Sequence, residues 1–227
     1  MSKHLATEIE RLKKRLLYLS GLVEENFLLS VQAIVERDAD LAATVIEGDS
    51  KIDQTEVDLE EDCLKALALH QPVAIDLRVI IAILKINNDL ERVGDLAVNI
   101  AERAAYLSVH DTVRMPADLP RMAAKTRDML KQALDALVEE DIERANAVCA
   151  ADDEVDGYNR AMYRQLEESV REQPDNLTCL MQLYAVARHL ERIADHATNI
   201  AEDVIYMFTG DIIRHSGDAG AVPPLQT

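Results

Sequence analysis

A stretch of nineteen residues occurs twice in this chain, at an offset of 100 positions. Residues 88–106 have the sequence NDLERVGDLAVNIAERAAY, and residues 188–206 have the sequence RHLERIADHATNIAEDVIY, which is identical at ten of the nineteen positions. The identical positions include Glu, Asp and Asn residues, which core packing alone does not require. A chain with such a repeat is built from two copies of one structural unit, so the repeat constrains the fold more than any other feature.

The spacing of apolar residues predicts helices along almost the whole chain. On the first helix the apolar positions alternate in steps of four and three, as on the buried face of a bundle helix: Leu5, Ile9, Leu12, Leu16, Leu19 and Val23. The boundary signals are the candidate N-caps Asp38 and Asp40, the breaks Pro72 and Pro174, and the stop Gly210. These signals predict six helices, at about residues 5–37, 40–70, 73–107, 119–139, 141–172 and 176–208.

Each half of the chain therefore contains three helices, and helices joined by breaks of roughly two to five residues should be antiparallel. We expect an all-α fold of two tandem antiparallel three-helix bundles, related by a pseudo-two-fold internal repeat. Residues 1–108 form the first bundle, residues 109–118 a linker, residues 119–215 the second bundle and residues 216–227 a disordered tail. A coiled-coil protein with a purely structural role would show the same helical pattern.

The overall composition excludes several classes of function. The net charge of −18 argues against direct binding to nucleic acid or to an anionic lipid surface. The apolar run at residues 79–84 is far too short to cross a bilayer, and the charged N-terminus does not match a signal peptide. Three cysteines without a shared motif fit a reducing compartment. We therefore expect a cytoplasmic protein that is not inserted in a membrane and that self-associates most simply as a homodimer.

Acidic residues form a stripe on each repeated helix. Glu91 and Asp95 are about 40° apart around a helix, and Asn99 falls about 80° from Glu91. The preceding helix carries two aspartates that lie as far before the turn as this pair lies after it. Folding each hairpin at its turn therefore brings four carboxylates to the same height. The candidate metal ligands are Asp49, Asp53, Glu91, Asp95 and Asn99 in the first half, and Asp152, Asp156, Glu191, Asp195 and Asn199 in the second half.

Four adjacent anions need a counter-charge, and oxygen ligands of this kind suit hard or borderline cations. A solvated acidic face, with neighbouring arginines as partners, is the alternative and is the better explanation of any single stripe. Two matched sets, each centred on its own turn, favour a metal. The first set is richer, because Glu56 and Glu60 extend it. The second half has Asn159 and Tyr163 at those positions, so we expect the second site to be weaker.

No motif in the sequence indicates a particular catalysed reaction. None of the histidines forms Glu-x-x-His with these carboxylates, which argues against a ferritin-like di-iron oxidase. His196 lies off the stripe and fits a surface position or a contact between helices better than a metal ligand, and Cys149 fits a buried core position. The sequence has no glycine-rich phosphate loop, G-x-S-x-G motif or Cys/His pairing. We therefore expect a protein that is not an enzyme, with a metal-carboxylate enzyme or a metal store as the alternative.

Several segments resemble one known family. DLERVGDLAVNIAE and HLERIADHATNIAE are similar to the paired Glu-x-x-x-Asp signatures of the PhoU family, and GDSKID, ADDEVD and AIDLR resemble it as well. The resemblance spans about residues 5–215 and implies two three-helix bundles. It also implies a cytoplasmic negative regulator of phosphate uptake and of the phosphate regulon, which works as an adaptor with a phosphate ABC transporter and a sensor histidine kinase.

The resemblance has a further implication for the acidic residues. Some members of the family carry clusters of iron or zinc at the positions that match the eight Asp and Glu candidates above, with Asn99 and Asn199 one turn further on. The expected cofactor is therefore iron, zinc or another divalent metal. The chain departs from a symmetric pattern at Asn159 and Tyr163, which makes full occupancy of the second site less favourable.

Overall fold

The computed structural model describes residues 3–110 and 113–210 of the chain. Within these residues the protein consists of α-helices and one short 3-10 turn, with no β-strand, so the predicted all-α fold is confirmed. The helix bounds agree with the predicted ones to within two residues, while the predicted tail at 216–227 lies outside the described residues. The elements are α1 (Lys3–Glu36), α2 (Ala39–His70), α3 (Ala74–Ser108), α4 (Asp118–Glu139), α5 (Ile142–Glu172), η1 (Pro174–Asn176) and α6 (Leu177–Thr209).

Capping groups end the helices where the sequence signals them. The Asp38 carboxylate accepts hydrogen bonds from the backbone N–H groups of Asp40 and Leu41 at 2.8 and 3.0 Å, which caps the start of α2. Asp141 caps α5 in the same way. α6 ends at Gly210, whose φ of 86° lies in the left-handed region and whose N–H donates to a carbonyl one turn earlier. The predicted N-cap at Asp38 and the predicted stop at Gly210 are both confirmed.

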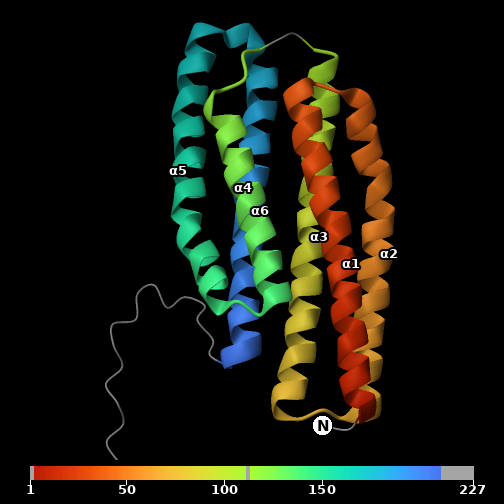
Figure 1. Ribbon diagram of the computed structural model, residues 1–227. Helices are drawn as coiled ribbons and strands as arrows, with labels where there is room; N and C mark the ends of the chain where they lie inside the picture. Colours follow the sequence, from red (N-terminus) through yellow and green to blue (C-terminus); the bar gives the residue numbers. More distant parts are fainter. Residues whose placement is uncertain (1–2, 111–112, 211–227) are drawn as a thin grey trace, which may run out of the picture.

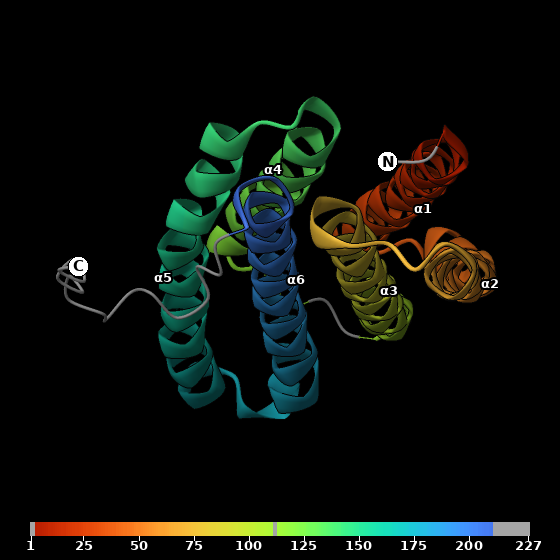
Figure 2. The same cartoon turned by 90° about the horizontal axis from the view of Figure 1, so that it is seen from below.

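The helices form two antiparallel three-helix bundles that lie side by side (Figure 1). α1, α2 and α3 make up one bundle, and α4, α5 and α6 make up the other. α3 and α6 run in opposite directions at the centre of the molecule and pack against each other, while α2 and α5 lie at its two outer sides (Figure 2). α1 and α4 contact each other much less than α3 and α6 do, so the bundles meet mainly along one pair of helices.

α3 is a central helix because its neighbours cover most of its surface. It contacts α1, α2 and α6, and Ile80, Ile83 and Ile86 are fully buried. Burial of each such side chain stabilises the fold by about 1.5–3 kcal/mol. The prediction that residues 77–86 belong to a deeply buried helix is confirmed for these isoleucines. Leu77 is 40 % exposed, because it lies in the first turn of α3 at the end of the bundle. Among the described residues, none of the helices is both long and apolar enough to cross a membrane.

Polar side chains also connect α3 to α6. Lys85 Nζ lies 3.0 Å from Oδ1 of the buried Asp203, and a buried carboxylate needs such a partner. His196 Nδ1 lies 2.8 Å from Asp89 Oδ1, to which Asn199 Nδ2 also donates at 3.3 Å. His196 therefore lies in a contact between helices, which is one of the two positions expected from its place off the acidic stripe.

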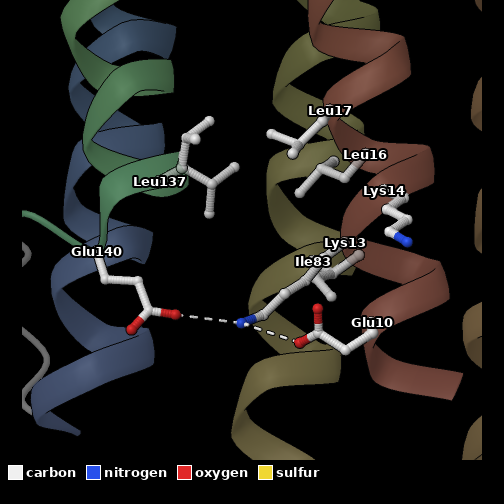
Figure 3. Close-up of a pocket in the computed structure, with 9 residues that line it drawn as sticks. Glu10, Lys13, Lys14, Leu16, Leu17, Ile83, Leu137 and Glu140 are labelled. Carbon is white, nitrogen blue, oxygen red and sulfur yellow. Dashed lines mark hydrogen bonds and ion pairs between the residues drawn. The ribbon is translucent and has the colours of Figure 1, made fainter. Parts of the chain in front are cut away.

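A hollow of ≈ 300 Å³ lies between the bundles on the side of α1 and α4. The apolar side chains of Leu16, Leu17 and Leu137 line it, and an ion pair between Lys13 and Glu140 at 3.3 Å bridges the two bundles beside it (Figure 3). Partly exposed ion pairs of this kind contribute about 0–1 kcal/mol. The packing of α3 on α6, rather than this ion pair, therefore sets the spacing of the bundles.

Candidate metal centres

The first acidic cluster lies between α2 and α3. Asp49 projects from α2, is half-buried, and has a pKa raised to about 6, with burial as the largest cause. The negative charges of Asp53, Asp95 and Glu91 raise the pKa of Asp49 further. Neighbouring charges have this effect only when they lie close, so the structure brings together the four carboxylates that the sequence predicts for the first half.

Glu91 on α3 belongs to this cluster, and two glutamates on α2, Glu56 and Glu60, extend it. Burial and the charge of Asp95 raise the pKa of Glu91, while Arg92, whose Nε lies 3.4 Å from Glu91 Oε2, opposes the shift. Burial also raises the pKa of Glu56, and the charges of Glu60 and Glu91 add to that rise. The acidic stripe of α2 therefore extends to Glu56 and Glu60, in agreement with the sequence pattern.

Asn87 is a member of the first cluster that the sequence pattern did not single out. Its side chain is almost fully buried, and its Nδ2 donates to Glu56 Oε1 at 2.7 Å and to the Glu56 backbone carbonyl at 3.1 Å. The sequence could have indicated Asn87, because it lies four residues before Glu91 and so continues the four-residue spacing of Glu91, Asp95 and Asn99. By holding Glu56, Asn87 fixes the orientation of one carboxylate of the cluster.

Gly94 allows α2 to pack closely on α3 at this point. A Cβ atom at residue 94 would lie 3.2 Å from Ile52 Cγ2 and 3.4 Å from Asp49 Oδ1. Both contacts are tight, so a larger side chain would push Asp49 and its helix outward. The equivalent residue of the second half is Ala194, which carries that methyl group.

Buried oxygen atoms without hydrogen-bond partners show whether a cation fits the first cluster. Asp49 Oδ1 and Asn87 Oδ1 are buried and accept no hydrogen bond from the part of the chain that the structure describes. Glu91 Oε2 is also buried without a hydrogen bond, and its partner is the ion-pair contact with Arg92 Nε at 3.4 Å. Buried acceptors without a donor are costly, and carboxylate and amide oxygens are the ligands that hard cations prefer. The donor atoms of the first cluster therefore fit a divalent cation.

The carboxylates of the cluster do not yet surround a single point. Among residues 3–110 and 113–210, no three His, Cys, Asp or Glu side chains converge closely enough to hold one metal ion. Asp53 and Glu60 are exposed, so their side chains can rotate toward Asp49 and Glu91 without disturbing the core. Metal binding at the cluster therefore stays a prediction.

The second acidic cluster lies between α5 and α6. Burial is the largest cause of a rise in the pKa of Asp195 to about 6, and the charges of Glu191, Asp152 and Asp156 raise it further. Burial and the charge of Asp156 also raise the pKa of Asp152, whereas a hydrogen bond from Thr198 Oγ1, at 3.4 Å, lowers it. The structure therefore brings together the four predicted carboxylates of the second half as well.

The second cluster has fewer acidic neighbours than the first. Asn159 and Tyr163 occupy the positions that correspond to Glu56 and Glu60. Asn159 Oδ1 is buried without a hydrogen-bond partner among the described residues, so it offers one neutral oxygen. The Tyr163 ring instead lies edge-on to Tyr184, with 5.7 Å between the ring centroids. Fewer negative oxygens surround this site, in line with the expectation of weaker binding.

The side-chain amides of Asn99 and Asn199, one turn beyond the carboxylates, donate to groups other than the carboxylates of the two clusters. Asn99 Nδ2 donates to the backbone carbonyl of Asp95 at 2.8 Å. Asn199 Nδ2 donates across the bundles to Asp89 Oδ1 on α3. The structure thus places Asn199 in the contact between α3 and α6, where the buried carboxylate of Asp89 accepts its hydrogen bond. A ligand role for Asn99 and Asn199 stays a prediction.

Two of the cysteines, Cys63 and Cys149, offer no thiolate to the acidic clusters. Cys63, Cys149 and Cys179 are all free thiols. Burial is the largest cause of the raised pKa of Cys63, about 12, and of Cys149, about 11. Both thiols therefore stay protonated at neutral pH, and a protonated thiol is neither a nucleophile nor a good metal ligand.

Comparison with known proteins adds to this geometry. A family model described as the PhoU domain matches residues 16–104 and residues 119–204, which are the two bundles. The phosphate-specific transport system accessory protein PhoU homolog of Aquifex aeolicus is 39% identical over 208 residues, which cover 92% of this chain and 94% of that protein. The protein of the same description from Pseudomonas putida is 37% identical over 218 residues, which cover 96% of this chain and 85% of that protein.

Solved structures show the same arrangement of helices. The crystal structure of PhoU from Pseudomonas aeruginosa superposes with a TM-score of 0.88 at 37% identity, over 91% of this chain and 99% of that one. The structure of the phosphate transport system regulatory protein PhoU from Streptococcus pneumoniae superposes with a TM-score of 0.85 at 28% identity, over 92% and 98% of the two chains. The two-bundle architecture is therefore shared with both proteins.

Proposed function

The chain belongs to the PhoU family, and we propose that it is a cytoplasmic negative regulator of phosphate uptake and of the phosphate regulon. The match of both bundles to the family domain is the observation that supports this role most directly. The relatives that it resembles over most of their length are named as accessory proteins of phosphate-specific transport. A role accessory to phosphate transport is the part of the function that these names support, and negative control is the finer step.

We infer that the protein acts by contact, as an adaptor between a phosphate ABC transporter and a sensor histidine kinase, rather than by catalysis. An apolar surface at the α2–α3 turn suits such contact, since Leu69, Val73 and Ile75 are 78%, 75% and 63% exposed. The turn lies at the lower end of the first bundle in Figure 1, away from the contact with α4. Contiguous exposed apolar residues mark protein interaction sites. A homodimer is the simplest assembly for such a bundle, and sedimentation equilibrium tests it.

A divalent metal, iron or zinc among others, has a structural part in this proposal. When bound, the ion supplies the positive charge that offsets the repulsion among the carboxylates and links the two helices of each hairpin. The residues that would hold it are Asp49, Asp53, Glu91 and Asp95 between α2 and α3, and Asp152, Asp156, Glu191 and Asp195 between α5 and α6. A fixed hairpin presents its turn to a partner in one geometry, which relates the metal to the adaptor role.

A metal-carboxylate enzyme or a metal store is the second candidate function. The observation in its favour is that Asp49 and Asp195 each have a pKa raised to about 6, as groups that exchange protons near neutral pH do. Turnover of a substrate, or redox cycling of the bound metal, by the purified protein would favour this candidate over the adaptor.

A reporter strain tests the regulatory role. In cells that lack the gene, a phosphate-starvation promoter should stay active in phosphate-rich medium, and the wild-type gene should restore its repression. Val73→Glu at the apolar turn should restore repression poorly and should no longer co-purify with the transporter or the kinase. Val109→Glu, which changes a valine that is 77% exposed at the opposite end of α3, is the matched control and should behave as wild type. Full repression in the deletion strain would contradict the proposed function.

A further inference from the structure

The contact between α3 and α6 has two ends, which the internal repeat relates to each other. At the end where α3 begins and α6 finishes, each of two buried carboxylates has a partner on the other helix. Asp203 pairs with Lys85, and Asp89 accepts hydrogen bonds from His196 and Asn199. Every acid named at this end therefore has a partner of opposite charge or a hydrogen-bond donor across the two helices.

The other end of the contact between α3 and α6 carries basic residues at the positions that the 100-residue repeat relates to Asp203 and Asp89. Arg103 on α3 stands where the repeat has Asp203, and His189 on α6 stands where it has Asp89. Basic side chains thus replace both carboxylates. Arg103 Nε and His189 Nδ1 are buried, and neither has a hydrogen-bond partner in the part of the chain that the structure describes. Two buried nitrogen atoms at this end therefore lack a hydrogen-bond partner among the described residues.

Two more arginines flank His189 on α6, one residue before it and three residues after it. The positive charges of Arg103, Arg192 and Arg188 all act on the half-buried His189. Of the residues described, Glu102 alone forms an ion pair with any of these arginines, at 3.7 Å from Arg103 and half exposed to solvent. We call this group the basic end, and it consists of Arg103, Arg188, His189 and Arg192.

The nearest other acid does not neutralise the basic end. Glu191 lies next to Arg192 and three residues after Arg188 on the same helix, and the charges of both arginines act on it. The charges of Asp156 and Asp152 also act on Glu191, because it belongs to the second acidic cluster. A concentrated positive charge is therefore left at the basic end of a protein whose net charge is −18.

We propose that the basic end binds a phosphate-class oxyanion. A tetrahedral anion accepts several hydrogen bonds at once, and guanidinium groups match its geometry by donating two parallel bonds. The anion supplies an acceptor to Arg103 Nε and to His189 Nδ1. It also restores at this end the negative charge that the two carboxylates provide at the other. Neither acidic cluster contributes an atom to the site, so binding requires no metal and does not depend on the proposed regulatory role.

Isothermal titration calorimetry on the full chain, stripped of metal with a chelator, tests this site with inorganic phosphate in a chloride buffer. We expect saturable binding of one anion per chain. Arg103→Gln should weaken it about tenfold or more, because that change removes a charge-assisted hydrogen bond. His189→Phe, which removes the ring nitrogen atoms, should weaken it as well. Arg127→Gln makes the same change of charge at an exposed position of α4 and should leave the affinity unchanged.

Two further ligands identify the source of the phosphate group. Sulfate has the same shape and should compete with inorganic phosphate. A nucleoside monophosphate that binds more tightly than phosphate, with the same loss in Arg103→Gln, would assign the basic end to a phosphorylated small molecule. Absence of saturable heat for all three ligands up to about 10 mM would overturn the proposal, since millimolar affinity is the weakest that a specific site would show. Equal weakening by Arg103→Gln and Arg127→Gln would also overturn it.

Discussion

The two acidic clusters lie on equivalent helical hairpins, α2–α3 and α5–α6, yet different residues surround the four carboxylates of each cluster. The first cluster has two additional glutamates, a buried asparagine that orients one of them, and a glycine that lets the helices approach: Glu56, Glu60, Asn87 and Gly94. The second has an asparagine, a tyrosine, an alanine and a threonine: Asn159, Tyr163, Ala194 and Thr198. The comparison shows that a repeated fold preserves the positions of the four carboxylates while the charge around them changes independently.

Removal of the two aspartates on α2 should have the largest effect on metal affinity and should distinguish the two clusters most clearly. Asp49→Ala with Asp53→Ala should lower metal affinity at the first cluster by more than about 100-fold, since even supporting residues account for about 10–100-fold. The matched pair, Asp152→Ala with Asp156→Ala, should remove a weaker site. The metal-free fold should stay intact or become slightly more stable, because an i,i+4 repulsion of about 0.2–0.5 kcal/mol is lost. Competitive metal titration of both variants checks these outcomes.

Asn87→Ala should weaken the first site alone, by about 10–100-fold, because it releases the carboxylate of Glu56. Thr198→Val is the matched change in the second cluster, and its effect should be smaller, since the Thr198 hydrogen bond is long at 3.4 Å. Titration of each variant with the same metal measures both. Equal losses at the two sites would show that Asn87 supports the fold in general rather than the first site.

The stability of the metal-free protein should rise as the pH falls from about 7.5 to about 5. The pKa of Asp49 and that of Asp195 are raised to about 6, above the value of about 3.9 in an unfolded chain. The folded state therefore binds these protons more tightly, and the stability they contribute is lost as the pH rises through about 6. About 1 kcal/mol for each carboxyl remains after allowance for solvent screening.

Urea unfolding of wild type and Asp49→Asn at a series of pH values measures this dependence. The difference between the two proteins isolates Asp49 from the other ionisable groups, and the variant should gain less stability on acidification. Glu47→Gln, at an exposed position of the same helix whose charge is not among those that raise the pKa of Asp49, serves as the control. A variant with the same pH profile as wild type would show that Asp49 is not held in a desolvated, acidic environment.

The smallest effect on stability and metal binding should come from exchanging Gly94 and Ala194, the residues at which the two helices of each hairpin pack closely. Gly94→Ala gains about 1 kcal/mol of helix propensity but places a methyl group 3.2 Å from Ile52, so its net effect on stability should be close to zero. It should still weaken metal binding at the first site, by less than Asn87→Ala does. Ala194→Gly should lose about 1 kcal/mol of stability without a matching gain in affinity at the second site. Thermal unfolding with and without metal separates these results.

The sequence predicts much of the hairpin geometry because the signals are local. Asp38 as a cap, Pro72 as a break and the spacing of Glu91 and Asp95 fix each helix and its register at short range. Once the turn is placed, the heights of the carboxylates on the two helices follow from the rise per residue. The four predicted carboxylates of each half therefore come together as expected.

The contact between the two bundles could not be predicted in this way. Apolar periodicity shows which face of a helix is buried, but not which helix covers it. The sequence pattern accordingly did not show that Asn199 donates to Asp89 on the other bundle, or that Arg103 lies near His189. Asn87 was missed for a different reason, since an amide next to an apolar run carries no charge that would mark it as part of the site.

Metal content is the most direct measurement of whether the two clusters are unequal metal sites. Mass spectrometry should be applied to protein purified without chelators or a His-tag, as wild type and as the two double-alanine variants. Wild type should contain iron, zinc or another divalent metal. The variant at Asp49 and Asp53 should lose most of it, and the variant at Asp152 and Asp156 should lose the smaller share. Equal metal content in all three proteins would contradict this account and would leave both clusters as solvated acidic faces.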